Sequence, residues 1–282
     1  MRKIALVTGT STGLGLSMTL MLAKQGFHVY ATMRNLEKRS ALESQIASGM
    51  AVTIKQLDVQ DSVSVNQCVA EIIEQEGQID LLVNNAGAGF VRSTEQASEE
   101  DIQWVMDVNY MGVVRCTKAV LPFMRAARSG HIINISSVGG LVGQPFNEIY
   151  CAAKFAVEGY TESMASYIQP SFNIKFSLVE PGGISSEFGN NVLSQVEQSG
   201  GMLEDEYLPI LQKYIGGVQG RSDTGVYQTC NEVAAVVLDC VNNPNPPVRV
   251  RTSAWSNAFC ELKTQADPEG RKQQQSVIET FL

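Results

Sequence analysis

The sequence predicts an α/β fold: a doubly wound parallel sheet with helices on both faces, formed as a single domain over residues 1–282. Strand and helix patterns alternate through about the first 180 residues, as in parallel sheets that are covered on both sides. A glycine-rich turn joins the first strand to the first helix. The chain is also long enough to bury one large core.

Short apolar runs predict the strands, because such runs are typical of strands buried on both faces. Helical spacing of apolar residues predicts the helices between them. In the longest helix we expect Ser98 as the N-cap, since acidic residues follow it in the first turn. The expected strands are 4–8, 27–33, 52–57, 81–83, 131–135 and 174–179, and the expected helices are 13–25, 98–128 and 148–168.

The pattern weakens after Pro181. Residues 185–230 are rich in Gly, Ser and Gln and contain only broken helical patches, such as 207–214. We expect this segment to cover the substrate within the same domain. A helix at 231–240, a turn at 242–247, a last strand at 248–250 and helical patches after Ser253 complete the prediction.

Composition and charge exclude several classes of function. With 21 basic and 29 acidic residues the net charge is −8, which argues against nucleic acid and anionic membranes as partners. The six cysteines form no Cys-x-x-Cys pair and there are two histidines, so no metal site is expected. No apolar stretch reaches the ~18 residues of a membrane span, and the N-terminal apolar run is too short for a signal peptide. We therefore expect a cytoplasmic protein.

The turn after the first strand has the composition of a phosphate-binding loop. Glycines at 9, 13 and 15 would let the backbone turn tightly and approach a pyrophosphate, at the N-terminus of the first helix. This placement predicts a Rossmann-type dinucleotide site. The alternative is a tight turn with a purely structural role.

The end of the second strand bears on the choice between two cofactors. In NAD binders an acidic residue usually receives the ribose 2′-hydroxyl there. This chain has Arg34 in that neighbourhood, and a guanidinium suits a 2′-phosphate. The position therefore predicts NADP(H) in preference to NAD(H). The nearby Glu37 argues against this, and an ordinary surface arginine is the alternative.

Tyr150 and Lys154 are four residues apart, a spacing that places both side chains on one face of a helix. A free tyrosine has a pKa near ~10, and a nearby cation lowers it. A phenol adjusted in this way can act as a general acid or base. Ser137 lies thirteen residues upstream of Tyr150.

These motifs occur in an order that resembles the short-chain dehydrogenase/reductase family over about residues 3–186. The order is the glycine loop, Asp58, Asn84-Asn85-Ala86-Gly87, Asn109, Ser137, Tyr150, Lys154 and Pro181-Gly182. Residues 137–159 are similar to the branch that contains 17β-hydroxysteroid dehydrogenase type 1 and retinol dehydrogenases. That branch largely uses NADP(H), in agreement with the inference from Arg34.

The resemblance implies roles for individual residues. Tyr150 would exchange the proton, Lys154 would lower its pKa and bind the nicotinamide ribose, and Ser137 would bind the substrate oxygen. Asn109 would hold a water in a proton relay, although its side chain could instead be satisfied by the backbone at a helix kink. The implied cofactor-binding residues are Gly9, Ser11, Thr12, Gly13, Leu14, Gly15, Arg34, Asp58, Val59, Asn85, Ala86, Gly87, Tyr150, Lys154, Gly182, Ile184 and Ser186.

Two of these neighbourhoods have a structural alternative. Asp58 would accept from the adenine amino group, with the Val59 N–H beside it, but it could also be the N-cap of a following helix. Asn84 is expected to bond the backbone rather than a ligand. The resemblance further implies a homodimer or homotetramer formed through helices 99–128 and 148–168.

The expected substrate side is apolar, with Ser137, Val138, Gly139, Asn147, Tyr150 and Phe188 as the candidate contacts. Such a lining suits a bulky apolar ketone or aldehyde, similar to a steroid or retinoid. The function predicted is therefore hydride transfer between NADP(H) and such a small molecule. A 3-oxoacyl reductase and a non-catalytic NADP(H)-binding sensor are the alternatives.

Overall fold

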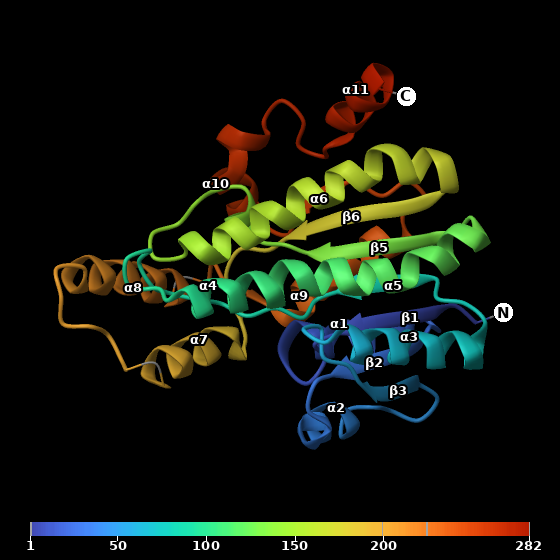
Figure 1. Cartoon of the computed structure of the whole chain (residues 1–282), viewed down its shortest axis with the longest axis horizontal. Coiled ribbons are helices and arrows are strands. Elements are labelled where there is room, and N and C mark those ends of the chain that lie inside the picture. The colour runs from blue at the N-terminus through green and yellow to red at the C-terminus, as the bar shows by residue number, and fades with distance from the viewer. Residues whose placement is uncertain (1, 199, 224, 282) are drawn as a thin grey trace.

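The computed structural model describes residues 2–198, 200–223 and 225–281, and a seven-stranded parallel sheet forms its centre (Figure 1). The strand order β3-β2-β1-β4-β5-β6-β9 confirms the predicted doubly wound fold. The order reverses between β1 and β4, which are hydrogen-bonded neighbours. The strands are β1 (Ile4–Thr8), β2 (His28–Met33), β3 (Ala51–Gln56), β4 (Leu81–Asn84), β5 (Gly130–Ile135), β6 (Ile174–Glu180) and β9 (Arg249–Arg251).

Helices cover both faces of this sheet. The longer ones are α1 (Gly13–Lys24), α3 (Ser62–Glu76), α4 (Glu99–Met106), α5 (Gly112–Ala127), α6 (Glu148–Phe172), α7 (Glu187–Gln198), α8 (Leu208–Asp223), α9 (Cys230–Asn242), α10 (Ala254–Thr264) and α11 (Arg271–Phe281). The shorter ones are η1 (Leu36–Arg39), α2 (Ser40–Glu43), the π-helical turn η2 (Asp107–Met111) and η3 (Val138–Gly140).

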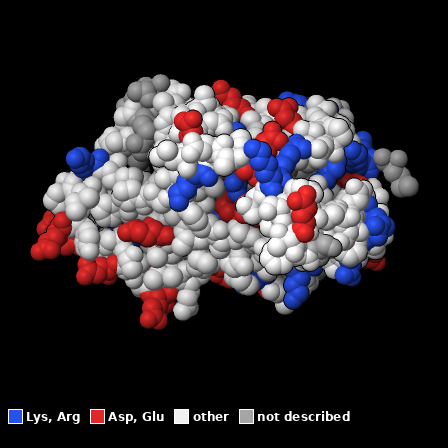
Figure 2. Space-filling view, turned by 90° about the horizontal axis from the view of Figure 1, so that it is seen from above, with Lys and Arg blue, Asp and Glu red and all other residues white. Residues whose placement is uncertain are grey.

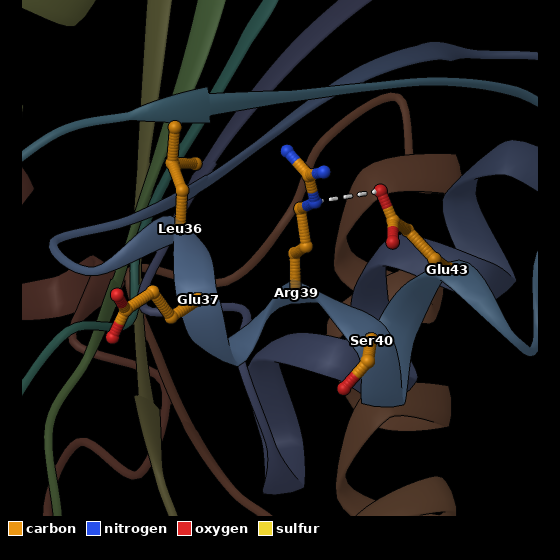
Figure 3. Close-up of a pocket in the computed structure, with 5 residues that line it drawn as sticks. All are labelled: Leu36, Glu37, Arg39, Ser40 and Glu43. Atoms are coloured by element: carbon orange, nitrogen blue, oxygen red, sulfur yellow. Dashed lines mark ion pairs between the residues drawn. The ribbon is translucent and has the colours of Figure 1, made fainter.

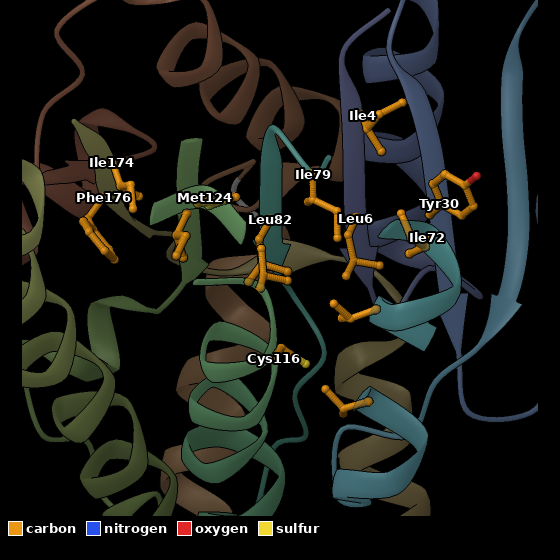
Figure 4. Packing of buried hydrophobic residues seen from close by; sticks show 14 of the residues in the cluster. Ile4, Leu6, Tyr30, Ile72, Ile79, Leu82, Cys116, Met124, Ile174 and Phe176 are labelled. Carbon is orange, nitrogen blue, oxygen red and sulfur yellow. The ribbon is translucent and has the colours of Figure 1, made fainter. Parts of the chain in front are cut away.

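Alternation along the strands produces two apolar layers. In β1, Ile4 and Leu6 face α3, α5 and α6, where they pack with Ile72 and Met124 (Figure 4). The intervening Ala5 and Val7 face α1 and α9. Both faces are therefore sealed from water, and the residues that follow the strands at their carboxyl ends are left to form the site.

The predicted helix 98–128 is interrupted. Ser98 is the N-cap, in a capping box with Asp101, but the α-helical pattern stops at Met106 and resumes at Gly112. The π-helical turn between them contains the buried Asn109, whose Nδ2 donates to Val105 O at 3.0 Å. This local widening, absent from our prediction, allows the Asn109 amide to bond outside its own helix.

The segment 185–230 is more regular than its composition suggested. It contains α7 and α8, and a short parallel pair formed by β7 (Ile184–Ser185) and β8 (Gln228–Thr229) ties its two ends together. In Figure 1, α7 and α8 lie at the end of the sheet where its strands terminate. The segment therefore leaves the fold and returns to it beside the carboxyl edge.

Candidate active site

The glycine loop forms a cradle at the carboxyl end of β1. Gly9 and Gly13 have φ of 70° and 59°, a conformation that favours glycine. A Cβ on Gly15 would lie 2.1 Å from Gly9 O, and one on Gly9 would lie 2.8 Å from Ala86 Cα. The backbone here is thus packed as closely as a pyrophosphate-binding turn requires, and Ser11, Thr12 and Leu14 complete it at the start of α1.

Asn85 and Thr8 lock this cradle to the end of β4. Asn85 Nδ2 donates to Thr8 O at 2.8 Å and to Gly9 O at 2.9 Å. Thr8 Oγ1 accepts from the N–H groups of Asn85 and Ala86, both at 3.0 Å. Asn85 therefore shapes the loop through its side chain, a role that the sequence did not reveal. Asn84, expected to bond the backbone, instead donates to Thr117 Oγ1 and Asn134 Oδ1.

The loop after β2 leaves Arg34 accessible. Arg34 is exposed and forms no ion pair with any residue that the structure describes. Arg39, by contrast, pairs with Glu43 at 3.1 Å (Figure 3). Glu37 points away from that pair, and its carboxylate accepts from Asn35 Nδ2 at 3.5 Å. Both neighbours are thus engaged, and Arg34 remains the candidate for a phosphate.

Asp58 does not cap the helix that follows it. Asp61 is the N-cap of α3, since its side chain accepts from Val63 N at 2.8 Å. Asp58 instead accepts from Gln60 N at 3.0 Å and donates its own N–H to Ser64 Oγ. Because this turn presents Asp58 and the Val59 backbone at the end of β3, both remain candidates for the adenine contact.

Ser137, Tyr150 and Lys154 meet beside this cradle. Ser137 caps η3 by accepting from Gly139 N at 3.0 Å, and its side chain is close enough to the Tyr150 hydroxyl to lower the pKa of that phenol. Lys154 is buried; its Nζ donates to Ile135 O at 2.9 Å and lies 5.7 Å from the centre of the Tyr150 ring. A Cβ on Gly87 would lie 3.7 Å from Lys154 Nζ, so the wall formed by Gly87 adjoins this group.

Burial dominates the proton affinity of both titratable groups. It raises the pKa of Tyr150 to about 12, and the nearby Ser137 side chain only partly opposes this. This direction is the opposite of the one that the Tyr–Lys spacing predicted. Burial also lowers the pKa of Lys154 to about 8, which the nearby Glu158 partly offsets. Tyr150 is therefore protonated at neutral pH in this structure.

The Asn109 side chain is satisfied by the backbone. Its Nδ2 donates to Ala88 O at 2.9 Å as well as to Val105 O, and its Oδ1 accepts from Ala88 N at 3.1 Å. The Asn109 amide is therefore satisfied by backbone groups, as the alternative to a water-holding role proposed. These bonds hold Ala88, and with it the neighbouring Gly87, against the π-helical turn.

The candidate substrate contacts divide into two groups. Val138 and Leu141 pack against Cys260 of α10 and belong to the core, and Gly139 is buried beside Cys151. Phe188 of α7 faces the site directly, with its ring centre 6.1 Å from that of Tyr150. Asn147 is engaged, since its Nδ2 donates to Tyr214 of α8 at 2.9 Å.

The segment after β6 approaches the glycine loop from the other side. A Cβ on Gly182 would lie 3.0 Å from the Trp255 ring, and one on Gly13 would lie 3.6 Å from Ser186 Cβ. Ser186 Oγ accepts from Phe188 N at 3.3 Å, while Ile184 belongs to β7. Gly182, Ile184 and Ser186 therefore lie where a dinucleotide held by the loop would be covered.

The sequence of this site matches a known family. Residues 3–197 match the family model for short chain dehydrogenase. The chain belongs to the short-chain dehydrogenase/reductase family. It is an oxidoreductase enzyme, and members of this family bind nicotinamide cofactors and act on small molecules. The described residues contain no helix long and apolar enough to cross a membrane.

Individual short-chain dehydrogenases are similar over almost the whole chain. Retinol dehydrogenase 8 from Bos taurus is 40% identical over 95% of this chain and 86% of its own length. The 17-beta-hydroxysteroid dehydrogenase type 1 from Homo sapiens is 36% identical over 95% of this chain and 83% of its own. The solved structure of ElxO with NADP bound superimposes with a TM-score of 0.75 at 26% identity, covering 92% of this chain and 100% of that one.

A second set of polar residues near the site was not predicted. Glu158 follows Lys154 by one helical turn, and Glu180 precedes Pro181 at the end of β6; both are buried. Arg249 and Arg251 of β9 pair with them. The signal in the sequence was the spacing of Tyr150, Lys154 and Glu158 at four-residue intervals, which places all three on one helix face.

Proposed function

We propose that this short-chain dehydrogenase reduces a bulky apolar ketone or aldehyde with NADPH, and that Tyr150 donates the proton. The observation that carries the proposal is the meeting of Ser137, Tyr150 and buried Lys154 beside the glycine cradle. A hydrogen-bond donor, a proton donor and a cation converge there at one edge of the sheet.

The residues of this chain would have the following roles. When bound, NADPH supplies the hydride that the carbonyl carbon accepts. The Ser137 hydroxyl donates a hydrogen bond to the carbonyl oxygen as negative charge develops on it. Tyr150 transfers its proton to that oxygen, and the Lys154 ammonium stabilises the phenolate that remains. The raised pKa of Tyr150 favours this direction, because the proton is in place before reduction begins.

The preference for NADPH rests on Arg34. Its guanidinium is exposed and suits the additional phosphate of NADP(H). The neighbouring Arg39 pairs with Glu43, and Glu37 is bonded to Asn35. Removing it by Arg34→Ala should raise the KM for NADPH at least tenfold and change the KM for NADH less than twofold. If wild type used NADH as well as NADPH, this role of Arg34 would be wrong.

The substrate class rests on the surroundings of Phe188. This side chain is 41% exposed and faces Tyr150, and Val192 of the same helix packs at Gly89. The segment 185–230 would thus cover the substrate with apolar groups. The names of the two relatives described above refer to retinol and to 17β-hydroxysteroids, which are molecules of this kind.

A 3-oxoacyl reductase remains the second candidate within this enzyme class. A substrate on an acidic carrier protein would require a basic docking surface. Among the described residues on the face shown in Figure 2, the end where α8 lies is mostly uncharged or acidic. This observation favours a free apolar substrate over one presented on a carrier.

The decisive experiment measures NADPH consumption with a panel of carbonyl compounds. The panel contains a steroid ketone, a retinal, a 3-oxoacyl thioester and a polar sugar ketone. We expect turnover of the first two by wild type and a loss of at least 10²-fold in Tyr150→Phe. Equal rates for the two proteins would refute the role of Tyr150, and activity confined to the sugar ketone would refute the substrate class.

We also propose that the protein is a cytoplasmic homodimer or homotetramer. Large apolar side chains are exposed on α5 and α6, among them Phe123, Phe155 and Tyr167. Light scattering of wild type against Phe155→Glu tests the assembly, and a monomeric wild type would refute it. Cell fractionation tests the location.

A further inference from the structure

Beneath Lys154 lies a buried cluster of charged residues that the proposed mechanism does not use. Tyr150, Lys154, Glu158 and Glu162 follow one another at four-residue intervals along α6 and so share one face. Glu158 is 5% exposed and Glu180 is fully buried. Burying a carboxylate is costly unless it is paired, so their partners should reveal what holds them.

The partners come from β9, beyond the residues that match the family model. Arg249 Nε lies 3.1 Å from Glu180 Oε1 and 3.8 Å from Glu158 Oε2, and this arginine also pairs with Glu162. Arg251 Nη1 donates to Glu180 Oε2 at 3.1 Å. Arg251 is itself fixed, because it donates to Asn257 Oδ1 and to Pro268 O as well.

Glu158 is the loosely held member of the cluster. Burial raises the pKa of Glu158, whereas the Ser136 hydroxyl, Arg249, Glu180 and Lys154 lower it, and among the described residues neither oxygen of Glu158 has a partner in good hydrogen-bond geometry. Arg249 is its one arginine partner among the described residues, at 3.8 Å, whereas two arginines lie 3.1 Å from Glu180. When ionised, Glu158 favours the ammonium form of Lys154.

We propose that the Glu158 carboxylate is the buried countercharge that keeps Lys154 an ammonium beside Tyr150. Glu158 is thus a positioning residue, because it acts on proton transfer through Lys154. Burial raises the pKa of Glu158, and Arg249, anchored by Glu180, opposes this by favouring the carboxylate. Since the inference deepens the proposed function, it rests on the roles of Tyr150 and Lys154 given there.

The electrostatic surroundings of Glu158 are set by five elements. Lys154 and Glu162 face it from α6, and Ser136 from the end of β5. Glu180 faces it from β6, Arg249 from β9 and Cys260 from α10. Lys154 is the member of this set that also lies beside Tyr150. A change of charge at Glu158 should therefore alter the protonation of Lys154 and, through it, proton transfer from Tyr150.

The test replaces Glu158 by its neutral isostere and follows the pH dependence of carbonyl reduction. In Glu158→Gln the alkaline limb of kcat/KM should move down by about one pH unit, because a neutral neighbour no longer supports the ammonium. Glu158→Asp keeps the charge and should show a smaller shift. Glu162→Gln is the matched control: it removes a carboxylate that also pairs with Arg249, but one turn further from Lys154, and should leave the limb in place.

A second readout requires no turnover. The affinity for NADPH, measured by fluorescence titration across the same pH range, should fall as Lys154 loses its proton, and earlier in Glu158→Gln than in wild type. If wild type reduces no carbonyl, the proposed function fails, and this titration still decides the role of Glu158.

Three outcomes would overturn the inference. A slower Glu158→Gln enzyme with an unmoved limb would show that Glu158 only packs the core. Equal shifts in Glu158→Gln and Glu162→Gln would show that the effect is not specific to the residue next to Lys154. If Glu158→Gln does not fold, Glu158→Ala, which also removes the charge, is measured in its place, and an unshifted limb there would contradict the inference.

Discussion

The glycine cradle can be tested by comparing a glycine-to-alanine substitution at two positions. Gly15→Ala should weaken NADPH binding, whereas Gly159→Ala should leave binding unchanged and stabilise the fold. Gly15 lies where a Cβ would be 2.1 Å from Gly9 O. A normal carbon–oxygen contact is about 3.3 Å, so the added methyl would intrude by about 1.2 Å. The obstacle is backbone, which cannot rotate away. Gly159 on α6, by contrast, has nothing within 4 Å of its Cβ position.

The expected magnitudes follow from these distances. Overpacking of this kind costs about 1–3 kcal/mol, and in Gly15→Ala the distortion falls on the turn that would hold the pyrophosphate. Since 1.4 kcal/mol is a factor of ten in affinity, the Kd for NADPH should rise roughly tenfold or more. Gly159→Ala should leave that Kd unchanged and stabilise the fold by about 0.5–1 kcal/mol, because alanine favours the helix.

NADPH fluorescence titration gives the Kd, and urea unfolding gives the free energy of unfolding for both variants. Gly159→Ala serves as the control for handling and for the change of side chain. If Gly15→Ala bound NADPH within twofold of wild type, the loop would not be the cofactor cradle. A loss of binding in both variants would show that the assay reports general damage.

Two further predictions concern stability and substrate access. Burial lowers the pKa of His131 in the folded protein to about 3. Below pH ~6.5 the unfolded chain therefore binds more protons than the folded protein, and as the pH is lowered from there toward 3 the free energy of unfolding decreases by about 1.4 kcal/mol per pH unit. His131→Gln should flatten this fall between pH 6 and 4 in urea unfolding, whereas parallel curves would contradict the assignment. A Cβ on Gly89 would lie 2.4 Å from Val192 Cγ2, so Gly89→Ala should displace α7 and raise KM for a bulky ketone about tenfold, with the Kd for NADPH unchanged. An unaltered KM would exclude contact between α7 and the substrate.

The sequence was sufficient to predict the sheet and its central helices, because strands buried on both faces are continuous apolar runs. It also contained the signals of α3, which we did not predict. Val65, Val69 and Ile72 recur at helical spacing, Asp61 caps the start and Gly77 ends the helix with φ of 76°. The π-helical turn is different, because it depends on bonds between Asn109 and Ala88, which the fold brings together.

The active site shows the same division between local and tertiary information. The four-residue spacing identified Lys154 as the neighbour of Tyr150, and the structure confirms that they adjoin. Spacing could not predict that Lys154 would be buried and Tyr150 half-buried, and desolvation reverses the expected direction of the Tyr150 pKa. Likewise, Arg249 is far from Glu158 in sequence and reaches it only because β9 pairs with β6.

Under the proposed function, the residues that would control the proton lie apart from those that would choose the substrate. The charged cluster lies between α6, β6 and β9, on the side of Lys154 away from α7, whereas Phe188 and Val192 approach Tyr150 and Gly89 from the covering segment. Gly89 and Glu158 have no direct partner in common among the contacts described, so the free-energy effects of substitutions at these two positions should add. A change at Gly89 should therefore alter which ketone is reduced without moving the pH profile, and a change at Glu158 should move the pH profile equally for every ketone. Coupling between the two in a double variant would show that the cluster also determines how the substrate sits.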